Sequence, residues 1–150
     1  MDSKIIQQDV IKSSLYGEIP ISNEQIYEFE HGLIGFSSIH NFVLFPYENS
    51  DLFILHALSE DTSFILIPAL KIERELAFQV DSDTVEMLGV NDANEVVPFV
   101  IVHIVDDKPY MNTKAPILLV PSKQKGCQYV INDPSYSIRE PLVMKESERC

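Results

Sequence analysis

Short apolar runs separated by turn residues are the feature that most constrains the fold of this chain. Most runs are four to ten residues long and rich in Val, Ile, Phe and Tyr, and they include 42–45, 52–58, 64–67, 96–105 and 117–120. Such runs, bounded by turn-forming residues, are typical of strands in an all-β protein. The sequence therefore predicts a mainly β fold, a single-domain antiparallel β-barrel or sandwich with one or two short helices.

The chain has 150 residues, enough for one domain with a buried core. We expect the β domain to span residues 1–142, followed by a charged C-terminal tail at 143–150. No secretory signal is evident in residues 1–12, and no apolar run is long enough to cross a bilayer. Cys127 and Cys150 fit a reducing compartment, although a disulfide between them stays open. These features predict a cytoplasmic protein without a membrane partner.

Two segments predict particular elements, a central strand and a short helix. The run 96–105 is apolar on both faces, which predicts a central strand covered on both sides. The segment starting at Asp83 has the spacing of a capping box, with Glu86 three residues later and Gly89 as the end signal. It predicts a helix of one to two turns, and residues 37–41 predict a second, weaker turn.

Charge limits the kinds of partner that the chain can bind. Eleven basic and 23 acidic residues give a net charge of -12. Phosphate backbones repel such a chain, so direct nucleic-acid binding is not expected. A basic protein partner is favoured instead, although solubility alone explains the charge better.

A search for reactive groups finds no catalytic, cofactor-binding or metal-binding set. The carboxylate pairs lie in polar surroundings and are read as solvated surface: Glu28 with Glu30, Glu73 with Glu75, and Asp81 with Asp83. Cys127 has no identifiable base and is predicted to be buried and inert. The four histidines lack metal-ligand spacing. We therefore expect a protein that is not an enzyme and has no cofactor.

The segment from Phe29 to Phe36 is the first of two motifs. Gly32 and Gly35 can reach positive φ without steric cost, which predicts a tight, partly buried turn. Its aromatic ends, Phe29 and Phe36, are expected to insert into the core. The glycines do not open a helix after a strand, so the motif is not a dinucleotide fingerprint.

The second motif runs from Asn112 to Pro116. Ala115 precedes a proline and is biased towards extended backbone, and Pro116 lacks an N–H and belongs at a strand edge or start. Asparagine beside such a bend commonly bonds to local backbone. Asn112 is therefore expected to hold this loop rather than to catalyse a reaction.

Together these motifs resemble the FliW family of bacterial flagellar assembly factors. Phe29 to Phe36 is similar to the family's F-x-x-G-L-x-G-F element, and Asn112 to Ile117 is similar to its N-L-x-A-P-I/V element. Four further stretches match family elements in the same order: 53–57, 64–68, 128–131 and 136–139. The resemblance extends from about Tyr16 to Leu142. The chain departs from it at Thr113, where leucine is usual, and at His56 and Ala57, where Gln and Ser are usual.

The resemblance implies a regulatory role. FliW-like proteins bind CsrA, a small translational repressor of flagellin mRNA, and relieve its repression. They also bind flagellin as a chaperone-like partner, in competition with CsrA. Inhibition of CsrA could be steric or allosteric; the resemblance favours the allosteric route, and the sequence leaves both open. Flagellin would bind by strand addition or as a helix in a groove.

Contact residues are expected on the exposed parts of the two motifs. Glu28, Glu30 and His31 are the first candidates for partner binding, and Asn112 and Lys114 are the second. The remaining motif residues are expected to be architectural: Gly32, Leu33, Gly35, Phe36, Ala115 and Pro116.

Two other functions remain as alternatives. A small-molecule-binding β-barrel would need a deep apolar cavity with convergent polar groups, for which His56 and His103 are the obvious candidates. A structural subunit would need a self-complementary edge, and the polar turn at 47–51 does not provide one.

Overall fold

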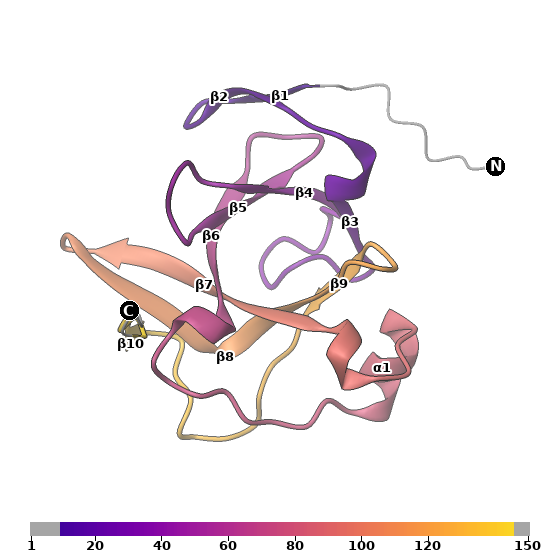
Figure 1. Ribbon diagram of the computed structural model, residues 1–150, viewed down its shortest axis with the longest axis vertical. Coiled ribbons are helices and arrows are strands. Elements are labelled where there is room, and N and C mark those ends of the chain that lie inside the picture. The colour runs from indigo at the N-terminus through magenta and orange to yellow at the C-terminus, as the bar shows by residue number, and fades with distance from the viewer. Residues whose placement is uncertain (1–9, 146–150) are drawn as a thin grey trace, which may run out of the picture.

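The computed structural model describes residues 10–145, and its main element is a closed barrel (Figure 1). Seven consecutive strands pair in chain order, and the last pairs with the first. They are β3 (Ile26–Phe29), β4 (Asn41–Pro46), β5 (Phe53–Ala57), β6 (Ser63–Pro68), β7 (Val97–Val105), β8 (Lys108–Val120) and β9 (Lys125–Gln128). The predicted mainly β fold is confirmed.

One pair of strands departs from the antiparallel prediction. Each strand of the barrel runs antiparallel to the next, but β3 and β9 pair in parallel, with Glu28 opposite Lys125 and Phe29 opposite Gly126. The reason is arithmetic, because in an up-and-down meander with an odd number of strands the first and last run in the same direction. The parallel closure brings the first motif beside the segment that follows β8.

The barrel interior is filled with side chains. Its core includes Phe29, Phe42, Leu55, Leu66 and Ile117, all essentially inaccessible to solvent. Phe29 and Phe42 meet edge to face with ring centroids 5.1 Å apart. Alternate residues of each strand supply this core, so the intervening residues point outward and need cover of their own.

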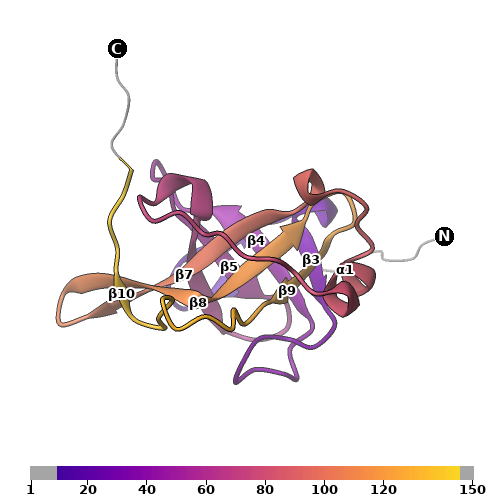
Figure 2. The same cartoon turned by 90° about the horizontal axis from the view of Figure 1, so that it is seen from below.

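Separate elements cover the outer face of the barrel at its two ends. A hairpin of β1 (Val10–Ser13) and β2 (Gly17–Pro20) lies over β4 and β5 at the top of Figure 1, where Ile11 packs with Val43 and Ile54. At the other end an extended segment, residues 73–80, runs below the barrel to helix α1 (Ser82–Leu88) (Figure 2). Three short 3₁₀ helices also occur among the described residues: Asn23–Gln25 before β3, Ala69–Lys71 after β6, and Ala93–Glu95 before β7.

Helix α1 is the predicted helix, but it begins two residues earlier than the capping-box spacing suggested. Asp81 is the N-cap, and its carboxylate accepts a hydrogen bond from the Thr84 N–H at 2.9 Å. The prediction that Asp83 is the N-cap was wrong because Asp83 lies inside the first turn of the helix. Gly89 ends the helix with φ of 71°, as predicted. The weaker turn predicted at 37–41 is present at residues 37 and 38 as a turn without a helix, and Asn41 already begins β4.

Strand β7 is central as predicted, between β6 and β8. Its first half is covered on both sides, since Phe99 and Val100 are both buried. Its second half and the first half of β8 extend beyond the barrel as a ribbon, visible in Figure 2. Ile104, on this ribbon, is 58% exposed, so the expectation of cover on both sides holds only for the first half.

The C-terminal part of the described chain returns to the barrel. Strand β10 (Glu140–Pro141) pairs with the start of β8. Met144 pairs with Ile72, and the Glu73 N–H donates to the Val143 carbonyl at 2.8 Å. Residues 143–145 of the expected tail therefore bond to the segment before α1. Residues 146–150, including Cys150, lie outside the described residues.

Candidate functional site

The turn of the first motif is built on its two glycines. Gly32 and Gly35 have φ of 64° and 85°, and the Phe36 N–H donates to the Leu33 carbonyl at 2.7 Å. Leu33 is buried, whereas Phe36 is 38% exposed and meets Phe64 edge to face. The prediction that Phe36 inserts into the core is therefore wrong. The tight turn between Leu33 and Phe36 sends one side chain inward and leaves the other at the rim.

Glu28, Glu30 and His31 are exposed and stand beside helix α1. Glu28 and Glu30 line a small cleft together with Met87, Leu88 and Lys125. Glu30 and His31 line a second, open depression with residues of the first turns of α1. The structure thus gathers carboxylates from two distant segments into one surface, which we call the acidic face: Glu28, Glu30, Asp81, Asp83 and Glu86.

Sequence reasoning missed this gathering. The pairs Glu28 with Glu30 and Asp81 with Asp83 each appeared as ordinary solvated surface. Nothing in the sequence signals that the β3–β9 closure brings them to one surface. On this face, hydrogen bonds from the Thr84 side chain and backbone hold the pKa of the Asp81 carboxyl below its usual value. The Asp81 carboxyl therefore stays ionised at a lower pH than a free aspartate does.

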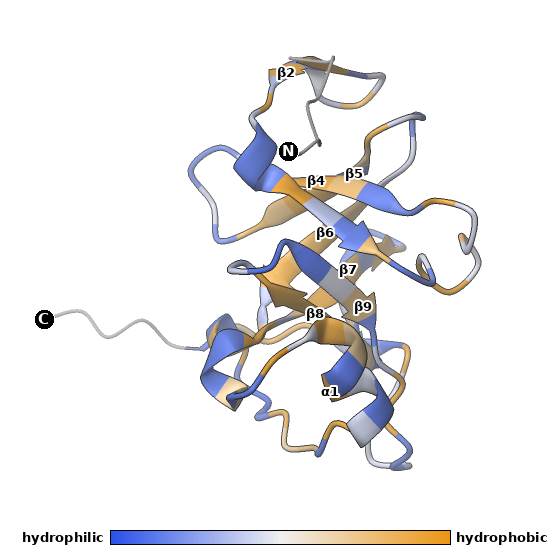
Figure 3. Cartoon of the chain, turned by 90° about the vertical axis from the view of Figure 1, so that its right-hand side faces the viewer, coloured by the Kyte–Doolittle hydropathy of each residue, from blue (hydrophilic) through white to orange (hydrophobic). Residues whose placement is uncertain are grey.

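A second feature of this region is an apolar groove on the other side of α1. It has a volume of about 420 Å³ and lies between the segment 78–80, helix α1 and the start of β7. We call it the α1 groove. Its apolar lining includes Phe78, Val80, Val85, Leu88, Val90 and Val96, and Asp92 lies at the polar part of the lining. In Figure 3, hydrophobic and hydrophilic residues alternate along α1, as expected of a helix that borders both surfaces.

The second motif forms a bulge in the middle of β8. Between the pairs Phe99 with Ile117 and Ile101 with Asn112, strand β8 contains extra residues. Asn112 Oδ1 accepts the Ala115 N–H at 3.0 Å and holds this bulge closed. Asn112 therefore acts on local backbone, in line with the favoured interpretation.

The other residues of the second motif serve the same bulge. Pro116 is buried at the point where the β7–β8 ladder is interrupted, so its missing N–H leaves no bond unmade. Lys114 Nζ donates to the Asp133 carbonyl at 3.3 Å. The structure thus places Asn112 and Lys114 in the bulge, whereas Glu28, Glu30 and His31 lie beside α1.

Gln128 joins the two motifs. Its side-chain carbonyl accepts the Ile34 N–H at 2.8 Å, and its Nε2 donates to the Ala115 carbonyl at 3.2 Å. One side chain of β9 therefore holds both the turn of the first motif and the bulge of the second.

Thr113, a departure from the family pattern, has a buried polar role of its own. Its hydroxyl donates to Glu140 Oε1 at 2.7 Å and accepts the Ser137 N–H at 3.1 Å. Arg74 Nη1 holds both oxygens of the same carboxylate, at 2.7 and 2.9 Å, and lies over the Tyr136 ring. Leucine could not take part in this network, so the threonine fits the presence of Arg74 and Glu140.

The described residues near this surface give little support for a cysteine nucleophile or a metal site. Cys127 is buried, and burial together with the nearby Asp81 charge raises the pKa of its thiol to about 11. The thiolate that a nucleophile or metal ligand needs is therefore scarce at neutral pH. Within residues 10–145, no group of three or more His, Cys, Asp or Glu side chains could hold a metal ion.

In the same range, no helix is long and apolar enough to cross a membrane.

The two histidines proposed for a ligand cavity lie apart from the filled barrel interior. His56 is on the outer face of β5, and His103 stacks on Tyr110 in the projecting ribbon with centroids 6.1 Å apart. They do not converge on an apolar cavity inside the barrel.

Comparison with known proteins identifies the family. A family model described as FliW protein matches residues 10–142. The chain belongs to the FliW family. A FliW from Caldicellulosiruptor bescii, named a flagellar assembly factor, is 32% identical over 138 residues, which cover 90% of this chain and 91% of that protein. A FliW from Bacillus licheniformis is 31% identical over 137 residues, covering 89% and 96%.

A crystal structure of a flagellar assembly factor FliW has the same fold. It superposes with a TM-score of 0.82 at 26% identity and covers 92% of this chain and 99% of that one. The resemblance inferred from the two motifs is confirmed. The acidic face and the α1 groove therefore lie on a chain with the FliW fold.

Proposed function

We propose that this chain is a non-enzymatic, cytoplasmic regulator of flagellum assembly that binds CsrA and flagellin alternately. Membership of a family whose relatives are named flagellar assembly factors supports the first part. The observation that carries the second part is the pair of surfaces on α1, one acidic and one apolar. Each surface suits one of the two partners that the family resemblance implies.

The acidic face is the proposed site for CsrA. An RNA-binding protein presents basic groups for phosphates, and the acidic face presents five carboxylates from β3, the following turn and α1. Complementary charge speeds encounter and favours the correct partner. Among the described residues, Lys125 is the one basic side chain that lines the cleft, and its Nζ donates to the Met87 carbonyl at 3.5 Å.

The α1 groove is the proposed site for flagellin. A segment that folds on binding needs a groove that accepts an apolar stripe of side chains. The α1 groove offers a lining of aliphatic and aromatic side chains. Asp92 adds a carboxylate that could pair with a basic residue of such a segment.

Sharing of helix α1 explains the proposed competition. Asp83 and Glu86 face the depression of the acidic face, whereas Val85 lines the α1 groove. Leu88 lines both the groove and the cleft beside Glu28. A partner that orders or shifts α1 on one side therefore changes the other side. This route couples the two partners without requiring their footprints to overlap.

Calorimetric titration tests this proposal. CsrA is titrated into the protein alone and into the protein saturated with flagellin, and we expect binding in the first case and its loss in the second. An Ala93→Trp variant fills the α1 groove from an exposed position and should weaken flagellin while leaving CsrA binding intact. Ala77→Trp, on the segment before α1 and outside the groove lining, is the matched control. Absence of binding to both partners would overturn the proposal.

A further inference from the structure

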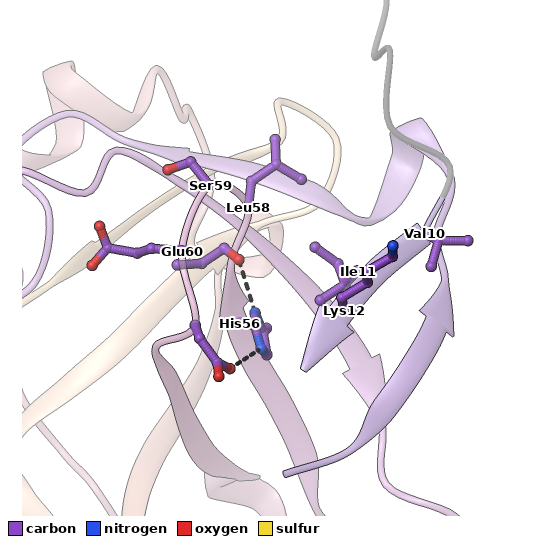
Figure 4. A pocket seen from close by; sticks show the side chains of 9 residues that line it. Val10, Ile11, Lys12, His56, Leu58, Ser59 and Glu60 are labelled. Carbon is purple, nitrogen blue, oxygen red and sulfur yellow. Dashed lines mark hydrogen bonds and ion pairs between the residues drawn. The ribbon is translucent and has the colours of Figure 1, made fainter. Parts of the chain in front are cut away.

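His56 lies beneath the N-terminal hairpin, away from both proposed binding surfaces. Leu55 and Ala57 point into the barrel, so His56 points to the outer face of β5 that the β1–β2 hairpin covers. Its side chain is 1% exposed. It lines a pocket of about 370 Å³ between β1 and the turn after β5, shown in Figure 4.

The hydrogen bonds of His56 define where its proton must be. Nδ1 lies 2.8 Å from the Ala57 carbonyl, and because a carbonyl only accepts, Nδ1 carries a hydrogen. In the neutral ring Nε2 is then an acceptor. Among residues 10–145, Nε2 has no hydrogen-bond partner, although it is completely buried. A buried acceptor without a partner is unfavourable, and a proton on Nε2 removes that defect if a second acceptor faces it.

Asp61 is the acceptor that faces Nε2. The distance from Nε2 to Asp61 Oδ1 is 3.6 Å, and both dashed contacts of the imidazole are drawn in Figure 4. In the neutral ring two acceptors oppose each other across this gap. In the imidazolium form, Nε2–H points at a carboxylate and forms an ion pair. The geometry is thus complementary to protonated His56.

Asp61 also holds the hairpin. Both of its carboxylate oxygens lie 3.3 Å from the Ser14 N–H, at the turn between β1 and β2. In the sheet pairing, β1 and β2 pair only with each other among the described strands. The hairpin is held on the barrel by apolar packing around Ile11, by a side-chain hydrogen bond between Tyr16 and Ser63, and by this carboxylate. Asp61 makes the polar contact between the hairpin turn and the β5–β6 turn.

The other ionisable groups around His56 come from the hairpin and from the turn after β5. Lys12 of β1 and Glu60 and Asp61 of the β5–β6 turn line the same pocket. Tyr16, from the hairpin, packs against Phe45, and burial raises the pKa of its hydroxyl. In Figure 4 the Glu60 side chain points away from the imidazole. Histidine is the side chain type that changes charge between about pH 5 and 8. Among the described residues that line this pocket, His56 is the only histidine.

We propose that His56 and Asp61 form a proton-operated latch that fastens the β1–β2 hairpin to the β5–β6 turn. Protonation of Nε2 closes the latch by pairing the imidazolium with the carboxylate that holds the Ser14 N–H. Loss of that proton leaves two opposed acceptors and loosens the hairpin. The latch concerns only the hairpin end of the barrel, so it stands whether or not the acidic face binds CsrA.

Hydrogen exchange at the Ser14 amide tests the latch. The measurement is the protection factor, corrected for the intrinsic rate at each pH, in the wild-type protein at about pH 5.5 and about pH 8. We expect protection at pH 8 to be lower by about fivefold or more, because one charge-assisted contact is lost. A long-range ¹⁵N–¹H spectrum of the imidazole should show a proton on Nε2 at the lower pH.

Two variants and one control isolate the pair. His56→Gln supplies an amide donor at every pH, so its Ser14 protection should not change between the two conditions. Asp61→Asn removes the carboxylate and should give low protection at both. His103→Gln, in the β7–β8 ribbon, should keep the wild-type response. The latch is refuted by equal protection of the wild-type protein at both pH values, by a pH response that survives in His56→Gln, or by an imidazole that stays neutral at pH 5.5. The imidazole spectrum and Asp61→Asn decide the question if His56→Gln does not fold.

Discussion

Gln128 accepts the backbone N–H of Ile34 at 2.8 Å, although the two residues are 94 positions apart. The amide of the same side chain donates to the Ala115 carbonyl. Through this one residue, the glycine turn that carries Glu30 and His31 and the bulge that contains Pro116 are held in fixed relation. The two motifs that identify the family are therefore parts of one structural unit.

Replacing Gln128 with Ala should loosen this unit. It removes an acceptor and a donor together, and leaves the Ile34 N–H and the Ala115 carbonyl without these partners. We expect the free energy of unfolding to fall by about 1–3 kcal/mol, measured by urea denaturation. Gln79→Ala, at an exposed side chain, is the control and should change stability by less than about 0.5 kcal/mol. Equal effects of the two substitutions would contradict the bridging role of Gln128.

Gly32 is required because its φ is positive and because a Cβ there would clash with its neighbours. Comparison with Gly17, where only φ is positive, separates these two effects. A Cβ at Gly32 would lie 2.5 Å from the Phe36 carbonyl oxygen and 2.8 Å from Ser37 Cα, and φ is also positive. At Gly17 φ is 78° but a Cβ meets nothing within 4 Å. Both substitutions strain the backbone, but only Gly32→Ala also places a Cβ against neighbouring backbone atoms. We therefore expect Gly32→Ala to destabilise the protein by roughly 1–3 kcal/mol more than Gly17→Ala. Thermal unfolding of both variants measures the difference, and a similar loss in each would show that strain alone matters.

Acid should weaken the cap of helix α1. Hydrogen bonds from Thr84 lower the pKa of Asp81 in the folded protein below its ordinary value of 3.8. A lowered folded pKa contributes stability that is fully present above the unfolded pKa and is lost as pH falls through the folded one. The melting temperature of wild type should therefore exceed that of Asp81→Ala at pH 7, and the gap should narrow below about pH 4.

The comparison with Asp81→Ala isolates this carboxylate from the others. Asp61 and Asp133 also have a pKa lowered by hydrogen bonds, so wild type and variant both lose stability in acid. Only the difference between them reports Asp81. A gap that stays constant from pH 7 to pH 3 would contradict a charged cap.

Charge reversal tests the acidic face. The double variant Glu28→Lys with Glu30→Lys should weaken CsrA binding by at least about tenfold, mostly through slower association. Glu73→Lys with Glu75→Lys makes the same change in net charge at the same spacing, on the exposed segment before α1, and should have a small effect. Surface plasmon resonance at two salt concentrations gives both rates. Equal losses for the two double variants would show that net charge, and not this face, governs binding.

The sequence predicted the strands well because alternation of apolar residues reports which face is buried. It failed where two distant segments meet. Phe36 was expected in the core because aromatic residues flanked the glycines, but the turn between Leu33 and Phe36 sends only Leu33 inward. Asp81 was overlooked as the N-cap because the capping-box spacing at Asp83 was the clearer pattern, and the box is not needed for a cap.

The candidate site was only partly predictable for the same reason. Glu28, Glu30 and His31 were expected to be exposed, and they are. Their neighbours Asp83 and Glu86 became visible only when the parallel pairing of β3 with β9 placed α1 beside them. Parallel closure depends on the number of strands in the whole barrel, which no local pattern contains.

The measurement that tests the central claim most directly is release of RNA from CsrA. A labelled flagellin leader RNA is bound to CsrA, this protein is added, and the bound fraction is followed by fluorescence anisotropy. The account predicts that the protein releases the RNA and that an excess of flagellin restores the complex. RNA that stays bound at saturating protein, or release that flagellin does not reverse, would contradict the account.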